Sequence, residues 1–185
     1  NTRNARAESR KAYMASAAFT ATEDMGFLAG SAVYVGAVIG DSNASSESQQ
    51  HYYVGATLAT PVEGLRLGVA FDYLNNSALF SPLGSTIVGA GAEVDIWTVA
   101  LYASFQATEK LSLHTRAEYV DAEAKSSFAK ADADGYAVTA TLQYDLWENV
   151  LSRLEVRWDH SDDVRFLGNG SKKNDWLVAA NLVYK

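Results

Sequence analysis

Hydrophobic and polar residues alternate along most of this chain with a period of two. The pattern is clearest in the last two runs, residues 151–160 and 174–185. Successive side chains of a β-strand point to opposite faces, so each run predicts a strand with one apolar and one polar face. The apolar positions are Leu154, Val156, Trp158, Trp176, Val178, Ala180, Leu182 and Tyr184.

The same alternation, interrupted by turn-forming residues, predicts nine strands. A helix would scatter the charged residues around its axis, because the helical period is about 3.6 residues. We therefore treat residues 1–185 as a single all-β domain. The strands are predicted near residues 11–22, 27–40, 51–60, 65–74, 93–108, 111–121, 135–147, 151–160 and 174–185.

The connections between these predicted strands alternate between short and long. The short ones are residues 23–26, 61–64, 109–110 and 148–150, and the long ones are residues 41–50, 75–92, 122–134 and 161–173. This asymmetry is typical of outer-membrane barrels, which have short periplasmic turns and long extracellular loops. The long connections are therefore predicted to be extracellular.

Aromatic residues on the apolar parity gather near both ends of the strands. Two rows of rings that flank an aliphatic band indicate the two interfaces of a membrane, which amphipathic rings prefer. Near the long connections lie Tyr13, Tyr52, Tyr73, Trp97, Tyr119, Tyr136, Trp158 and Trp176, and near the short turns lie Phe19, Phe27, Phe105, Tyr144 and Tyr184.

The charged residues within the strands occupy the opposite parity. A soluble antiparallel sheet would show the same alternation, but enclosing nine charges in a dry core carries a heavy desolvation cost. If the apolar face were the core, a soluble sandwich would remain possible and the aromatic rows would be coincidental. We therefore predict a transmembrane antiparallel up-and-down β-barrel. Its expected pore-lining residues are Arg66, Asp72, Arg116, Glu118, Asp145, Arg153, Glu155, Arg157 and Asp159.

Composition narrows the function classes further. No run reaches the roughly 20 apolar residues that a membrane helix requires. The net charge of -7 argues against nucleic acid as a partner. The absence of cysteine excludes disulfides and thiolate metal sites. His51 and His114 have no partner at ligand spacing, so we expect neither a metal nor another cofactor.

The end of the chain resembles a known family. Val178, Ala180, Leu182 and Tyr184 fit the last strand of bacterial outer-membrane barrels, as though a final Phe followed Lys185. The stretch ENVLSRLEVRWDHSDD resembles the penultimate strand of the OmpL-like β-barrel porins, with a tight Glu-Asn turn before a strand rich in Arg, Glu and Asp. The close match covers residues 147–185. The resemblance implies a porin-like barrel in the outer membrane of a Gram-negative bacterium.

The odd number of strands predicts a larger barrel, because single-chain bacterial barrels normally have an even number. If the last strand ends in the periplasm, the first strand descends from outside, and residues 1–10 belong to an extracellular loop. At least one strand is then expected before Asn1. A closed barrel of nine strands would contradict this hypothesis.

The expected function is a porin-like channel for passive diffusion of small hydrophilic solutes or ions. Both signs of charge occur on the inner face, so no ion preference follows. The charged residues of the eighth predicted strand are expected to form ion pairs with neighbouring strands, with contact to the solute as the alternative; they are Arg153, Glu155, Arg157 and Asp159. Residues 75–92 either constrict the pore or form an exposed loop.

A structural or partner-binding barrel is the alternative function. Small outward residues suit contact with another copy or with other envelope proteins, although alanine also tolerates lipid; they are Ala15, Ala17, Ala29 and Ala37. We expect no enzyme activity. His160, Ser161 and Asp162 are consecutive, and consecutive residues on a strand end cannot form a catalytic triad.

Overall fold

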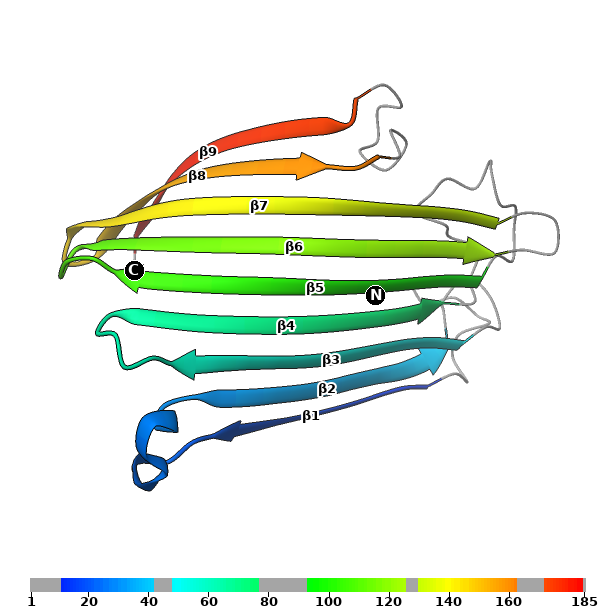
Figure 1. Ribbon diagram of the computed structural model, residues 1–185, viewed down its shortest axis with the longest axis horizontal. Helices are drawn as coiled ribbons and strands as arrows, with labels where there is room; N and C mark the ends of the chain where they lie inside the picture. Colours follow the sequence, from blue (N-terminus) through cyan, green and yellow to red (C-terminus); the bar gives the residue numbers. More distant parts are fainter. Residues whose placement is uncertain (1–10, 42–47, 77–92, 126–129, 163–171, 185) are drawn as a thin grey trace.

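The computed structural model describes residues 11–41, 48–76, 93–125, 130–162 and 172–184. They form one antiparallel sheet whose strands follow in chain order (Figure 1). The strands are β1 (Ala12–Thr20), β2 (Ala32–Asp41), β3 (Ser48–Ala59), β4 (Leu65–Asn76), β5 (Glu93–Gln106), β6 (Leu111–Lys125), β7 (Lys130–Trp147), β8 (Val150–His160) and β9 (Asn174–Tyr184), with a short 3-10 helix, η1 (Glu23–Leu28). In this part of the chain, no helix has the length and apolar character that crossing a membrane requires.

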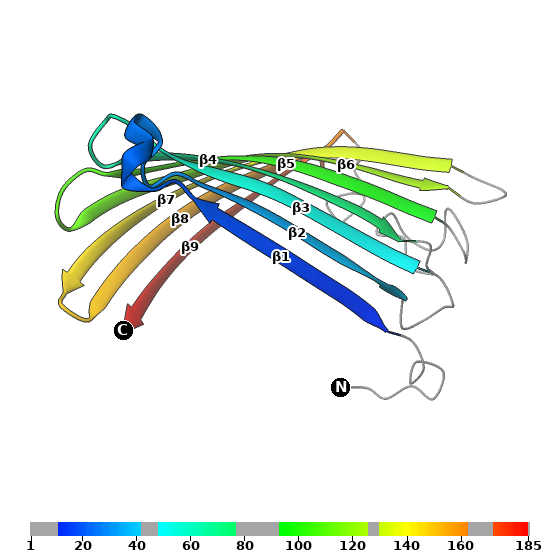
Figure 2. The same cartoon turned by 90° about the horizontal axis from the view of Figure 1, so that it is seen from below.

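The sheet is open. Each strand pairs only with its neighbours in sequence, so among the described residues β1 and β9 have a single partner each. Figure 2 shows the sheet twisted and curved, with these two strands at its edges. The predicted antiparallel up-and-down arrangement of nine strands is confirmed, and the described strands do not close into a nine-stranded barrel.

The strand register keeps the two parities on separate faces. On β5, Val99 lies opposite Phe71 and Tyr119, whereas the next residue towards the N-terminus, Thr98, lies opposite Asp72. We call the face that carries Val99 the outer face and the face that carries Thr98 the inner face.

Burial distinguishes the two faces. The buried residues within the strands all lie on the inner face, which is expected of the concave side of a curved sheet because side chains converge there. They are Ala32, Gly55, Ala70, Val94, Ala100, Ser112, Ala122, Ala124, Ala131, Ala133, Gly135, Ala137 and Leu151.

The second strand begins later than the sequence predicts. Residues 27–31 were expected within it, but η1 and a turn fill the connection from β1, and β2 starts at Ala32. Gly26 and Gly30 adopt positive φ angles of 60° and 79°, a backbone conformation outside the strand region. Phe27 and Ala29 therefore lie in the connection and on neither strand face.

The predicted long loop at residues 122–134 is wrong. β6 continues to Lys125 and β7 starts at Lys130, so only residues 126–129 separate the two strands. The reason is that apolar and polar residues still alternate here, but the apolar residues now lie on the inner face. Ala122, Ala124, Ala131 and Ala133 are buried on the inner face, and acidic residues occupy the outer parity between them. The strict alternation of short and long connections fails here and also at the start of the sheet, where residues 21–31 separate β1 from β2 but only residues 42–47 separate β2 from β3.

Candidate pore-lining face

All nine charged residues predicted to line a pore lie on the inner face. They are distributed over four strands, with most of them on β6 and β8. They are Arg66 and Asp72 on β4, Arg116 and Glu118 on β6, Asp145 on β7, and Arg153, Glu155, Arg157 and Asp159 on β8.

Four of these residues form one ion-pair network. The Arg157 Nη2 lies 2.7 Å from the Asp159 Oδ1, and its Nη1 lies 3.4 Å from the Glu118 Oε2. Glu118 also pairs with Arg116 on its own strand. The Glu118 side chain is only 12% exposed, whereas the arginines are in partial contact with solvent. Arg157 reaches across β7, so the network connects β6 with β8.

Among the described residues, the predicted ion pairs from β8 to other strands are found only for Arg157, which pairs with Glu118 on β6, whereas Asp159 pairs with Arg157 on its own strand. Arg153 donates from Nε to the Gln143 Oε1 at 2.9 Å, and Glu155 accepts a hydrogen bond from Thr141 at 3.0 Å. Neutral groups bind both residues because their cross-strand neighbours on β7 and β9 are uncharged.

Arg66, Asp72 and Asp145 lie outside this network and are more isolated. The Asp72 Oδ1 lies 3.0 Å from the Nε2 of His51 on β3. Arg66 has no carboxylate within ion-pair distance among the described residues. Asp145 has a buried carboxylate oxygen without a hydrogen-bond partner in the same part of the chain. Within the described ranges, no cluster of three or more His, Cys, Asp or Glu residues could hold a metal ion.

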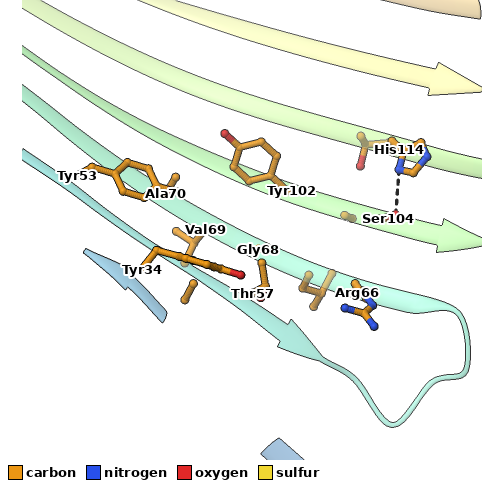
Figure 3. Close-up of a pocket in the computed structure, with 14 residues that line it drawn as sticks. Tyr34, Tyr53, Thr57, Arg66, Gly68, Val69, Ala70, Tyr102, Ser104 and His114 are labelled. Carbon is orange, nitrogen blue, oxygen red and sulfur yellow. Dashed lines mark hydrogen bonds between the residues drawn. The ribbon is translucent and has the colours of Figure 1, made fainter. Parts of the chain in front are cut away.

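The inner face of β2 to β5 carries a group of tyrosines that the sequence analysis did not single out. Tyr34, Tyr53 and Tyr102 project from three strands around a pocket of about 400 Å³ (Figure 3). The Arg116 Cζ lies 5.5 Å from the Tyr102 ring centroid. The sequence signal for this group is a tyrosine followed two residues later by a glycine, which occurs in both β2 and β3. These tyrosines lie on the polar parity, where an aromatic residue is easily overlooked.

The outer face carries the predicted aromatic row nearest the long connections. Rings touch along the sheet in an almost continuous series, with centroid separations of 5.0–6.4 Å. All eight predicted members point outward: Tyr13, Tyr52, Tyr73, Trp97, Tyr119, Tyr136, Trp158 and Trp176. His160 also joins the series, between Tyr136 and Trp158.

The second aromatic row is present with one exception. Phe19, Phe105, Tyr144 and Tyr184 lie on the outer face towards the short turns, whereas Phe27 belongs to η1. Trp97 and Phe105 are eight positions apart on β5. At about 3.3 Å per residue and the usual strand tilt, the two rows are roughly 20 Å apart across a membrane. This separation is similar to the about 25 Å apolar band of outer-membrane barrels.

Polarity reverses beyond the first aromatic row. The outer face of β5 to β7 then carries Asp95, Asp121 and Asp134, while the inner face carries Val94 and its alanine neighbours. This reversal marks where the apolar outer band ends.

An ion pair joins the two ends of the β8–β9 connection, outside the spanning strands. The Lys173 Nζ lies 2.9 Å from an oxygen of Asp162, and this hydrogen bond lowers the pKa of the Asp162 carboxyl.

These features together define a class of protein. A curved antiparallel sheet with an apolar outer band between two aromatic rows and a charged inner face is the wall of an outer-membrane β-barrel. The comparisons with known proteins agree. Over residues 3–185 the chain matches the family described as "Putative beta-barrel porin-2, OmpL-like", and it belongs to that family. The chain is therefore located in the bacterial outer membrane.

Two solved structures share the fold. OmpT, an outer membrane protein of Vibrio cholerae folded in vitro, has a TM-score of 0.59 and 17% identity, covering 94% of this chain and 56% of OmpT. A variant of OmpT that lacks loop L8 has a TM-score of 0.55 and 17% identity, covering 94% of this chain and 54% of the variant. The chain thus spans a little over half the length of these proteins. None of the curated protein sequences compared with the chain matches it.

Proposed function

We propose that this protein is a porin that lets small hydrophilic solutes and ions diffuse passively across the outer membrane. The observation that carries the proposal is the inner face, where nine charged side chains, among them Arg66, Arg116 and Arg153, lie together. A barrel filled by its own side chains would desolvate these charges, which costs several kcal/mol per ion. A water-filled interior avoids that cost.

The proposal includes further strands that complete the barrel. Within the described residues, the edges of β1 and β9 are unpaired, and unpaired backbone groups at membrane depth are costly because lipid cannot satisfy them. This chain covers only 56% and 54% of the two similar structures. A larger closed barrel also has the diameter that an aqueous channel needs.

The inner charges are expected to set selectivity. Glu155 is hydrogen-bonded to the neutral Thr141 and forms no ion pair among the described residues, so its charge is available to act on the lumen. Arg153 provides the opposite charge two residues away on the same strand, also with a neutral partner. Removing the negative charge of Glu155 should therefore favour anions, and removing the positive charge of Arg153 should favour cations.

Planar-bilayer recording of the complete purified protein tests this function. We expect stepwise conductance that rises with salt concentration. We also expect the reversal potential in a salt gradient to move towards anion preference in Glu155→Gln and towards cation preference in Arg153→Gln. Glu109→Gln, in the turn between β5 and β6, serves as the matched control and should move it less. A fully inserted protein that never conducts would contradict the proposal.

A structural or partner-binding role is the second candidate. Ala15 on β1 lies opposite Ala37 on β2, and Ala17 follows on the same outer face. Small side chains allow close approach of another protein surface. Chemical cross-linking in native membranes tests this role, and recovery of monomers alone would count against it.

A further inference from the structure

The inner face holds a pocket that is separate from the ion-pair network of β6 to β8. It lies over β4, has a volume of about 400 Å³ and is lined mainly by carbon atoms. Its volume falls within the roughly 300–1,000 Å³ of small-molecule sites. Tyr34, Tyr53 and Tyr102 form its walls, and Arg66 lies at the end nearest the short turn (Figure 3).

Glycines and alanine make the pocket hollow. Gly68 and Ala70 form its floor on β4, so no long side chain fills the space between the tyrosines. The Tyr53 ring lies along the wall over Gly55, where a Cβ would collide with the tyrosine hydroxyl group. A Cβ at Gly68 would lie 3.5 Å from the Cβ of Tyr102. The aromatic surfaces are therefore available to a ligand.

Arg66 is the cation that remains available in this pocket. It has no carboxylate partner among the described residues, whereas Arg116 already pairs with Glu118. Ser104 and His114, also in the lining, are hydrogen-bonded to each other at 2.9 Å. Asp72 lies outside the lining and is bonded to His51. The pocket thus combines aromatic walls with one guanidinium that has no ion-pair partner in the described part of the chain.

We propose that this pocket binds small aromatic carboxylates that enter the lumen, an inference that rests on the proposed pore. The ligand ring would pack against the tyrosines, because aromatic rings prefer offset or edge-to-face contact. Its carboxylate would pair with Arg66, whose planar guanidinium matches the two carboxylate oxygens. A sugar acid fits less well, because carbon walls cannot replace the water hydrogen bonds of its hydroxyl groups.

Isothermal titration of the complete folded protein in detergent with benzoate tests the site without requiring conduction. Arg66→Gln should weaken benzoate binding roughly 10-fold or more, as expected for loss of a charge-assisted hydrogen bond. Arg153→Gln is the matched control, because it removes the same charge from the same face but outside the pocket. Arg153, like Arg66, has no carboxylate partner among the described residues. It should change benzoate affinity less than about twofold.

The aromatic walls are tested in the same way. Tyr102→Leu should weaken benzoate binding roughly 2- to 10-fold, whereas Tyr144→Leu, on the outer face, should leave it unchanged. Benzyl alcohol, which lacks the charge, should bind equally to the wild type and to Arg66→Gln.

Three results would overturn the proposal. The first is that the folded protein does not bind benzoate. The second is that Arg66→Gln and Arg153→Gln lose the same benzoate affinity, and the third is that glucuronate binds as tightly as benzoate. The proposed function fails separately, if the inserted protein does not conduct while benzoate still binds. Thermal unfolding of each variant verifies that it is folded.

Discussion

The outer face of the sheet is expected to contact lipid hydrocarbon, and Leu101→Arg tests this most sharply. Leu101 is 57% exposed and lies midway between Trp97 and Phe105 on β5. Its cross-strand neighbours are Val69 and Ala117. At about 3.3 Å per residue, position 101 is roughly 13 Å along the strand from either ring. An arginine there reaches neither interface easily and should lower the free energy of unfolding by about 2–4 kcal/mol.

Two matched variants separate lipid contact from other effects of the new charge. Thr98→Arg places the same side chain on the inner face, opposite Asp72, and should change the free energy of unfolding by less than about 0.5 kcal/mol. Leu113→Arg lies on the outer face opposite Phe105, at the short-turn interface, and should cost about 0–1 kcal/mol.

Denaturant unfolding of the complete protein in lipid vesicles measures all three values. The expected order of cost is Leu101→Arg, then Leu113→Arg, then Thr98→Arg. If the first and last variants cost the same, the outer face does not contact hydrocarbon and the assignment of the two faces is wrong.

Three further predictions concern the network, the aromatic row and a turn. Glu118→Gln leaves Arg116 without its carboxylate partner and should lower the free energy of unfolding by about 1 kcal/mol in the same assay. The reversal potential in a salt gradient should also move towards anion preference. Trp97→Ala loses a ring contact at 5.1 Å, so it should cost about 0.5–1.5 kcal/mol more than Trp147→Ala, whose ring is 70% exposed. Equal costs would argue against a contribution from ring pairing. Gly64→Ala places a Cβ 2.7 Å from a backbone oxygen, whereas Gly26→Ala meets nothing within 4 Å. Both positions have positive φ, so the first should cost at least about 1 kcal/mol more in urea unfolding.

The sequence predicts the sheet well because its dominant signal is local. Strand parity depends only on the spacing of neighbouring residues, and the correct register then brings all the outer residues to one face. Val156, for example, is outward by its own alternation and pairs with Ala140 and Val178, which are outward by theirs.

The boundaries were harder to predict, for two physical reasons. Residues 122–125 and 130–134 still alternate, but beyond the apolar band their apolar residues face inward and their charged residues face outward. This reversed pattern suggests a loop when apolar residues are expected on the outer face. The late start of β2 depends on the positive φ angles of Gly26 and Gly30, and sequence alone does not reveal which glycines adopt them.

The site was predicted only in part, because pairing depends on several strands at once. The Arg157–Glu118 contact joins residues far apart in the chain across an intervening strand. The tyrosine pocket likewise depends on the alignment of Tyr34, Tyr53 and Tyr102 from three strands. Two predictions concern residues that the structure largely does not describe. They are the pore constriction by residues 75–92 and the extracellular position of residues 1–10.

Water access along β8 is the most direct test of a solvent-filled lumen behind a lipid-facing wall. The chain contains no cysteine, so single cysteines can be placed at successive positions from 153 to 158 and labelled in intact membranes with a charged maleimide. We predict fast labelling at the inner positions Arg153, Glu155 and Arg157, and protection at the outer positions Leu154 and Val156. Equal labelling of both sets, or labelling of the outer set alone, would contradict the assignment of a water-filled, charged inner face.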